Sequence, residues 1–134
     1  MVDRSVVILF DNKTKFHLVI DEKWMYIYHG RWSKNLKPPK NIKSYSQAWW
    51  GSESNGFMTG TEGYVRYSIM DGESETGDVS NNWVQIRWEN PYYGFNSYPS
   101  TISNNDLYSI TRNPNTGSGN EATVIITFSM INPD

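Results

Sequence analysis

The side chains that most often carry catalysis are scarce in this 134-residue chain. His17 and His29 are its two histidines, and it contains no cysteine. His17 alternates with Phe16 and Leu18 in a strand-like run, and His29 ends another such run, so both fit surface or structural roles. No zinc-protease HExxH, GxSxG or phosphate-binding glycine loop occurs. We therefore predict a protein that is not an enzyme, with no catalytic residue and no cofactor.

The acidic run DGESETGD at residues 71–78 is the other group of side chains that could take part in catalysis or metal binding. Paired carboxylates such as Glu73 and Glu75 could bind calcium or act as acid and base. A calcium loop of the EF-hand type needs about twelve residues and a terminal bidentate glutamate, a spacing that this run lacks. We predict a solvated loop here, and no metal site.

Aromatic side chains are the chemical feature that remains, because six Trp, nine Tyr and five Phe make up 15% of the chain. A ring with a polar tip suits both a membrane interface and stacking on a sugar. Packing inside the protein is the alternative, and it is favoured for Trp83 and Trp88. Trp49 and Trp50 are adjacent and must point to opposite faces of a strand. The candidates for ligand or membrane contact are Trp24, Tyr26, Tyr28, Trp32, Trp49, Trp50, Tyr92, Tyr93, Phe95 and Tyr98.

Short strand-like runs must position these side chains. Each is rich in β-branched or aromatic residues, and turn-forming Gly, Asn and Asp separate them. The runs cover residues 5–10, 15–20, 24–29, 42–50, 64–70, 83–89, 107–111 and 123–130. No helix is predicted. About eight short antiparallel strands in this length predict an all-β fold, a β-sandwich of two packed sheets, formed as a single domain over residues 1–134.

Periodicity also predicts which faces are buried. Val84, Ile86 and Trp88 alternate with polar neighbours, so one face of that strand should meet the core and the other should meet water or a ligand. The continuous apolar run at residues 124–126 instead predicts a strand that is buried on both faces, near the centre of a sheet.

Composition excludes several classes of protein. The formal net charge of −2 comes without a basic stripe, which argues against nucleic-acid binding. Lysines 34, 37, 40 and 43 flank two prolines, and a solvated loop is favoured there over contact with anionic lipid. No run approaches the roughly 18 apolar residues of a spanning helix. The apolar residues 6–10 are too few for a signal-peptide core of about 7 to 15 residues. We expect a soluble protein without a visible signal peptide.

The segment ESNGFMTGTEGYVRYSI, residues 53–69, joins a glycine-punctuated loop to an alternating strand. This segment resembles the aegerolysin family, and most closely the small aegerolysin-type components of bacterial binary insecticidal proteins. Four shorter motifs agree in order and approximate spacing. They are FDNKT at 10–14, GRW at 30–32, ENPYYGFNSY at 89–98 and GSGN at 117–120. The resemblance covers roughly the whole chain and implies an aegerolysin or actinoporin-like β-sandwich.

The resemblance also implies a function. The protein would be the membrane-binding component of a bicomponent insecticidal pore-forming toxin that recognises a midgut membrane lipid or receptor. A larger partner, of the β-trefoil-bearing insecticidal type or the membrane-attack-complex/perforin type, would form the pore. The protein would be bacterial, released or held in inclusions, and active at the target-cell surface. No lipid-contact residue transfers from the family one for one.

Two other classes remain open on the residues alone. A lectin-like sandwich could stack its aromatic side chains on sugars and use asparagines at residues 81–82 and 104–105 to bind hydroxyl groups. A structural protein without a ligand shares the same composition.

Overall fold

The computed structural model describes residues 2–72 and 82–132. The predicted solvated loop with Glu73 and Glu75 lies outside the described residues. The described residues form ten strands and no helix. The strands are β1 (Ser5–Asn12), β2 (Leu18–His29), β3 (Arg31–Trp32), β4 (Asn41–Ile42), β5 (Gln47–Glu53), β6 (Thr61–Ile69), β7 (Asn82–Asn90), β8 (Ser100–Ile102), β9 (Tyr108–Arg112) and β10 (Glu121–Met130).

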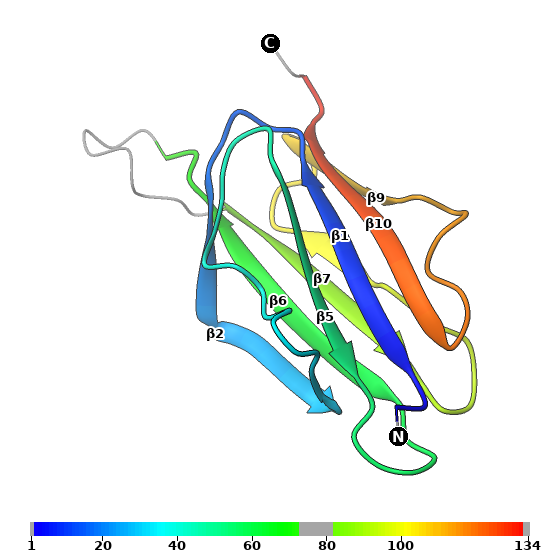
Figure 1. Ribbon diagram of the computed structural model, residues 1–134. Helices are drawn as coiled ribbons and strands as arrows, with labels where there is room; N and C mark the ends of the chain where they lie inside the picture. Colours follow the sequence, from blue (N-terminus) through cyan, green and yellow to red (C-terminus); the bar gives the residue numbers. More distant parts are fainter. Residues whose placement is uncertain (1, 73–81, 133–134) are drawn as a thin grey trace.

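The strands form two five-stranded sheets that pack face to face (Figure 1). One sheet has the order β3-β5-β1-β10-β9, and the other has the order β4-β2-β6-β7-β8. The prediction of an all-β sandwich of two packed sheets is confirmed. One pair departs from the antiparallel expectation, since β1 and β10 are parallel. These strands come from opposite ends of the chain, so no tight turn has to join them.

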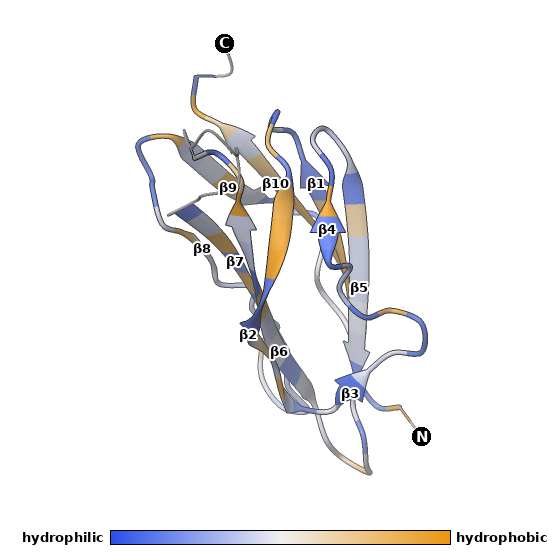
Figure 2. Ribbon diagram, turned by 90° about the vertical axis from the view of Figure 1, so that its left-hand side faces the viewer, coloured by the Kyte–Doolittle hydropathy of each residue, from blue (hydrophilic) through white to orange (hydrophobic). Residues whose placement is uncertain are grey.

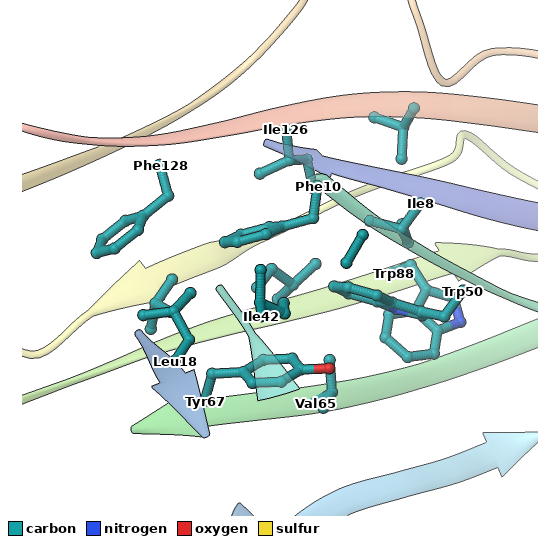
Figure 3. Packing of buried hydrophobic residues seen from close by; sticks show 14 of the residues in the cluster. Ile8, Phe10, Leu18, Ile42, Trp50, Val65, Tyr67, Trp88, Ile126 and Phe128 are labelled. Atoms are coloured by element: carbon teal, nitrogen blue, oxygen red, sulfur yellow. The ribbon is translucent and has the colours of Figure 1, made fainter. Parts of the chain in front are cut away.

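The core lies between the two sheets (Figure 3). Phe10 and Trp50 of one sheet face Tyr67 and Trp88 of the other, and all four side chains are almost fully buried. The strand β7 buries alternate residues as predicted, with Val84, Ile86 and Trp88 inside. The strand β6 alternates in the same way. Burial of large apolar side chains on both inner faces is the main term that stabilises the sandwich.

One prediction about burial is wrong. The strand β10 lies between β1 and β9 and is the most hydrophobic strand in Figure 2 (orange). However, only one of its faces is in the core. Val124 and Ile126 are buried, whereas Ile125 points outward and is partly exposed. A continuous apolar run indicates a buried strand, but it does not reveal that no described element covers the outer face of this sheet.

Several strand boundaries also differ from the sequence prediction. The runs at 15–20 and 24–29 join into β2, whose register against β6 shifts between Ile20 and Met25. The run at 42–50 divides into β4 and β5. The short edge strands β3 and β8 were not predicted. Two or three residues carry too little periodicity, and their pairing depends on a neighbour that is distant in sequence. Among the described residues, no helix could cross a bilayer.

Candidate functional site

Several loops gather at one end of the sandwich, beside the N-terminus at the bottom of Figure 1. They are the segment before β1, the β5–β6 loop at residues 54–60, the β7–β8 loop at 91–99 and the β9–β10 loop at 113–120. This end holds the glycine-punctuated segment and the aromatic segment that sequence analysis singled out. The geometry of these loops therefore decides which candidate side chains come together.

The β5–β6 and β7–β8 loops are in direct contact, and Gly60 permits this contact. A Cβ atom on Gly60 would lie 2.7 Å from the carbonyl oxygen of Asn90 and 2.7 Å from the Cα of Pro91. Those neighbours are backbone atoms and cannot rotate away. The β5–β6 loop is also tied to the N-terminal segment, because the backbone N–H of Met58 donates to the Asp3 carboxylate at 2.7 Å. Together these contacts hold the loops in one arrangement.

Four large side chains on these two loops point into solvent, and we call them the apolar tip: Phe57, Met58, Tyr93 and Phe95. Their exposed fractions are 78%, 45%, 78% and 95%. Single exposed apolar residues are common, but several on two adjoining loops are typical of a surface that meets a partner or a membrane. The predicted candidates Tyr93 and Phe95 belong to this tip. Tyr93 packs edge-on against Tyr92 at 4.8 Å between ring centroids.

Tyr92 and Tyr98, the other candidates on the β7–β8 segment, are partly buried. The ring of Tyr92 lies 4.5 Å from the guanidinium carbon of Arg4. The hydroxyl of Tyr98 donates to the carbonyl of Gly117 at 2.6 Å, and burial raises the pKa of that hydroxyl. These two side chains position the loops, whereas Tyr93 and Phe95 are free to meet a ligand.

The candidates Trp24, Tyr26 and Tyr28 lie elsewhere, on the outer face of the sheet that contains β2. All three are substantially exposed and share one face of β2, as predicted. With Tyr64 and Trp83 they form a row that we call the aromatic ladder. Its rings already contact cations. The guanidinium carbon of Arg66 lies 3.8 Å from the ring centroid of Trp24 and 3.7 Å from that of Trp83. Cation–π contacts of this kind stabilise the exposed face.

The remaining tryptophan candidates are dispersed. Trp50 is fully buried in the core, so its nomination as a contact residue is wrong. Trp32 is half-buried and packs 5.8 Å from the ring of Trp88. Trp49 is 57% exposed on the outer face of the other sheet, which confirms that the Trp49 and Trp50 side chains point in opposite directions. The structure brings none of these three side chains to the apolar tip.

An acidic hollow of about 470 Å³ lies beside the tip and is lined by His29, Glu62, Glu89 and Tyr92 among others. Burial, and then the charge of Glu62, raise the pKa of Glu89. Glu62 is itself paired with Arg87, and this hydrogen bond raises the pKa of the Arg87 guanidinium. Within residues 2–72 and 82–132, no three His, Asp or Glu side chains are placed to hold a metal ion.

Known structures share this architecture. The lipid binding protein Nakanori superposes with a TM-score of 0.73 at 14% identity, over 96% of this chain and 72% of that protein. IP-1A from Alcaligenes faecalis superposes with a TM-score of 0.67 at 16% identity, over 98% and 94% of the two chains. RahU, solved in complex with a TRIS molecule, gives 0.67 at 14% identity, over 98% of each chain. This chain has their fold.

One sequence relative is also similar to part of the chain. An uncharacterized Dictyostelium discoideum protein is 30% identical over 95 residues, which are 71% of this chain. The match spans only 8% of the length of that protein. No model of a known protein family matches the chain.

Sequence reasoning missed two residues of the apolar tip, Phe57 and Met58. Both stand inside the glycine-punctuated segment, between Gly56 and Gly60. The glycines of that segment and the strand that follows it are its more conspicuous features. The available signal was the pair itself, because two large apolar residues in a tight polar loop have little opportunity to reach a core.

Proposed function

We propose that this protein binds membrane lipid through the apolar tip while the sandwich stays folded. The observation that carries the proposal is the exposure of Phe57, Met58, Tyr93 and Phe95 on two loops that are fixed against each other. Each such side chain contributes up to about 1.5–3 kcal/mol when it leaves water for an apolar environment. Because the loops are ordered beforehand, less of this gain is spent on ordering them. The fold shared with the lipid binding protein Nakanori supports the proposal.

In the fuller form of the proposal, the protein is the small component of a bicomponent insecticidal toxin. It would be bacterial, released or stored in inclusions, and would recognise a midgut membrane lipid or receptor. A larger partner, of the β-trefoil-bearing or membrane-attack-complex/perforin type, would supply the pore. The resemblance of residues 53–69 to the small insecticidal aegerolysins supports this form.

The burial of the strands supports a division of roles in which this chain binds the membrane and the partner forms the pore. A membrane-spanning β-strand needs about 9 to 11 residues and an apolar face toward lipid. The strands β6, β7 and β10 have 9, 9 and 10 residues, yet each commits its apolar face to the core. Insertion of any of them would dismantle the sandwich. The purified chain should therefore bind membranes without making them leak.

Co-sedimentation with liposomes tests the proposal. Liposomes from insect midgut lipid extract should retain the wild-type protein more than phosphatidylcholine liposomes do. The double variant Phe57→Ser/Phe95→Ser should remain largely in the supernatant. Tyr45→Ser is the matched control, since Tyr45 is 71% exposed but precedes β5 at the opposite end of the sandwich. Equal binding by the double variant and wild type would remove the tip from the account, and leakage caused by the chain alone would contradict the division of roles.

The aromatic ladder supports one other function, the binding of carbohydrate. Tyr26 and Tyr28 offer exposed rings on the outer sheet face, where sugar rings could stack. A glycan array separates the two functions, because a lectin would bind specific sugars with no lipid present. Tyr26→Ser/Tyr28→Ser would then abolish the array signal and leave liposome binding unchanged.

A further inference from the structure

A cavity of about 360 Å³ lies between the β7–β8 loop and the β9–β10 loop, immediately behind the apolar tip. Phe95 stands on its rim. Arg4, which precedes β1, and Arg112, which ends β9, line it from separate elements. The lining contains no aspartate or glutamate among the described residues. The cavity therefore combines two permanent positive charges with no negative side chain.

Hydrogen bonds hold the walls of the cavity in place. The side-chain amide of Asn96, on one loop, donates to the carbonyls of Gly117 and Gly119 on the other, both at 2.9 Å. The amide of Asn90 donates to the carbonyls of Gly119 and Asn120 at 3.1 and 3.0 Å. These bonds join the two loops. They also engage the backbone oxygens of Gly117, Gly119 and Asn120, so these three acceptors are already paired.

The two guanidinium groups are oriented and only partly engaged. Arg4 donates from Nη1 to the carbonyl of Asp3 at 2.7 Å and from Nη2 to that of Tyr92 at 2.8 Å. Arg112 donates from Nη1 to the carbonyl of Thr116 at 2.8 Å. A guanidinium carries five N–H donors, so both arginines keep donors for a further acceptor. All three contacts are to neutral carbonyls, which do not cancel the charge.

Of the three other arginines, Arg31 and Arg87 are neutralised by carboxylates, whereas Arg66 donates to the side-chain amide of Gln85 and contacts the rings of the aromatic ladder. Arg31 is paired with Glu53 at 2.9 Å, and Arg87 is paired with Glu62. The ion pairs of the described residues include neither Arg4 nor Arg112. In a chain with a net charge of −2, two unneutralised guanidinium groups at one cavity form a local positive site. The planar fork of arginine matches the oxygens of a phosphate group.

We propose that this cavity binds a phosphate group, with Arg4 and Arg112 donating to its oxygens. The inference rests on the proposed function, since a tip that enters a bilayer through Phe95 would carry the cavity to the depth of the lipid headgroups. The cavity volume falls within the range of about 300–1,000 Å³ that is usual for small-ligand sites. A phosphate ester with its substituent fits this volume. The protein thus selects lipids whose phosphate is accessible. The apolar tip adds affinity for the membrane but does not distinguish between lipid headgroups.

The test compares phosphatidylcholine vesicles with vesicles that also contain phosphatidic acid, whose phosphate is a terminal monoester. Glycerol 3-phosphate in solution, followed by NMR chemical shifts, provides the arm without a bilayer. The variants are Arg112→Gln and Arg4→Gln/Arg112→Gln, because Arg112 is exposed and its replacement should leave the fold intact. Lys23→Gln/Lys34→Gln is the control for net charge, since both lysines are exposed and lie outside the cavity.

We expect wild type to prefer vesicles with phosphatidic acid, and Arg112→Gln to reduce that preference about tenfold, the effect of one charge-assisted hydrogen bond. The lysine control should keep the preference. An equal loss in the lysine control would overturn the site in favour of general electrostatic attraction. If wild type binds both vesicles equally, the site is wrong while the proposed function stands. If wild type binds glycerol 3-phosphate in an Arg112-dependent way but no vesicle, the site stands and the proposed function fails.

Discussion

Gly60 lies against the backbone of Pro91 so closely that a Cβ atom on Gly60 would be 2.7 Å from the Cα of Pro91. This contact joins the β5–β6 loop, which carries Phe57 and Met58, to the β7–β8 loop, which carries Tyr93 and Phe95. The absence of a side chain at Gly60 thus lets the two loops that carry the four exposed side chains lie in contact.

Gly60→Ala should therefore separate the two loops. We expect it to lower the free energy of unfolding by about 1–3 kcal/mol, as overpacking does, and to weaken liposome binding. Thermal unfolding followed by circular dichroism and co-sedimentation measure the two effects. Ser44→Ala is the control, because Ser44 is exposed and precedes β5 at the opposite end of the sandwich. An unchanged melting temperature for Gly60→Ala would show that the loops do not need this contact.

Trp49 and Trp50 should differ sharply although they are adjacent. Trp50→Ala empties a large site in the core, and we expect a loss of about 3–5 kcal/mol in the free energy of unfolding. Trp49→Ala removes a mostly exposed ring, and its cost should stay below about 1 kcal/mol. Denaturant titration of both variants measures the contrast. Similar losses would mean that the outer face around Trp49 is covered in solution.

The contribution of Tyr67 to the free energy of unfolding should decrease at alkaline pH. Its hydroxyl donates to the carbonyl of Pro39 at 2.6 Å, and burial raises the pKa of this hydroxyl. Because the pKa is higher in the folded state, the contribution is complete below the unfolded value of about 10 and is lost as pH rises through the folded value. Tyr67→Phe should cost about 1 kcal/mol at neutral pH.

The difference between Tyr67→Phe and wild type should then shrink above pH 10, as measured by urea unfolding at a series of pH values. Tyr93→Phe changes an exposed tyrosine and should match wild type throughout. A pH-independent difference would show that the hydroxyl of Tyr67 does not remain protonated in the folded state.

The contribution of Glu89 to the free energy of unfolding should depend on pH in the acidic range. Burial and the neighbouring Glu62 raise the pKa of Glu89, so the folded protein binds this proton more tightly than the unfolded chain does. Stability therefore falls as pH rises from the unfolded value of about 4.3 through the folded value. Glu89→Gln avoids the charge and should be more stable than wild type at pH 7, by less than about 1 kcal/mol, and equal to it below pH 4. Glu22→Gln, at an exposed position, is the control. A less stable Glu89→Gln at pH 7 would contradict the assignment.

The predictable part of the structure is the part that depends on near neighbours. The alternation in β6 and β7 correctly indicated which side chains enter the core, because successive residues of a strand point to opposite faces. The same rule correctly set Trp49 and Trp50 on opposite sides. It could not tell which of the two was inside, and Trp50 was wrongly nominated for the surface. That choice depends on the second sheet, which packs on one side of β5 alone.

By itself, the sequence determined that the chain is all-β and which residues share a strand face. It also indicated that aromatic loop residues are the main candidates for ligand or membrane contact. These features follow from local propensity and a period of two. The tertiary structure alone decided that β1 pairs with β10, that Ile125 faces outward, and that Phe57 joins Phe95 at one end while Trp24 lies on a sheet face. It also brought Arg4 and Arg112 to one cavity. Such juxtapositions join residues far apart in the chain, and only the packing of the two sheets sets the distance between them.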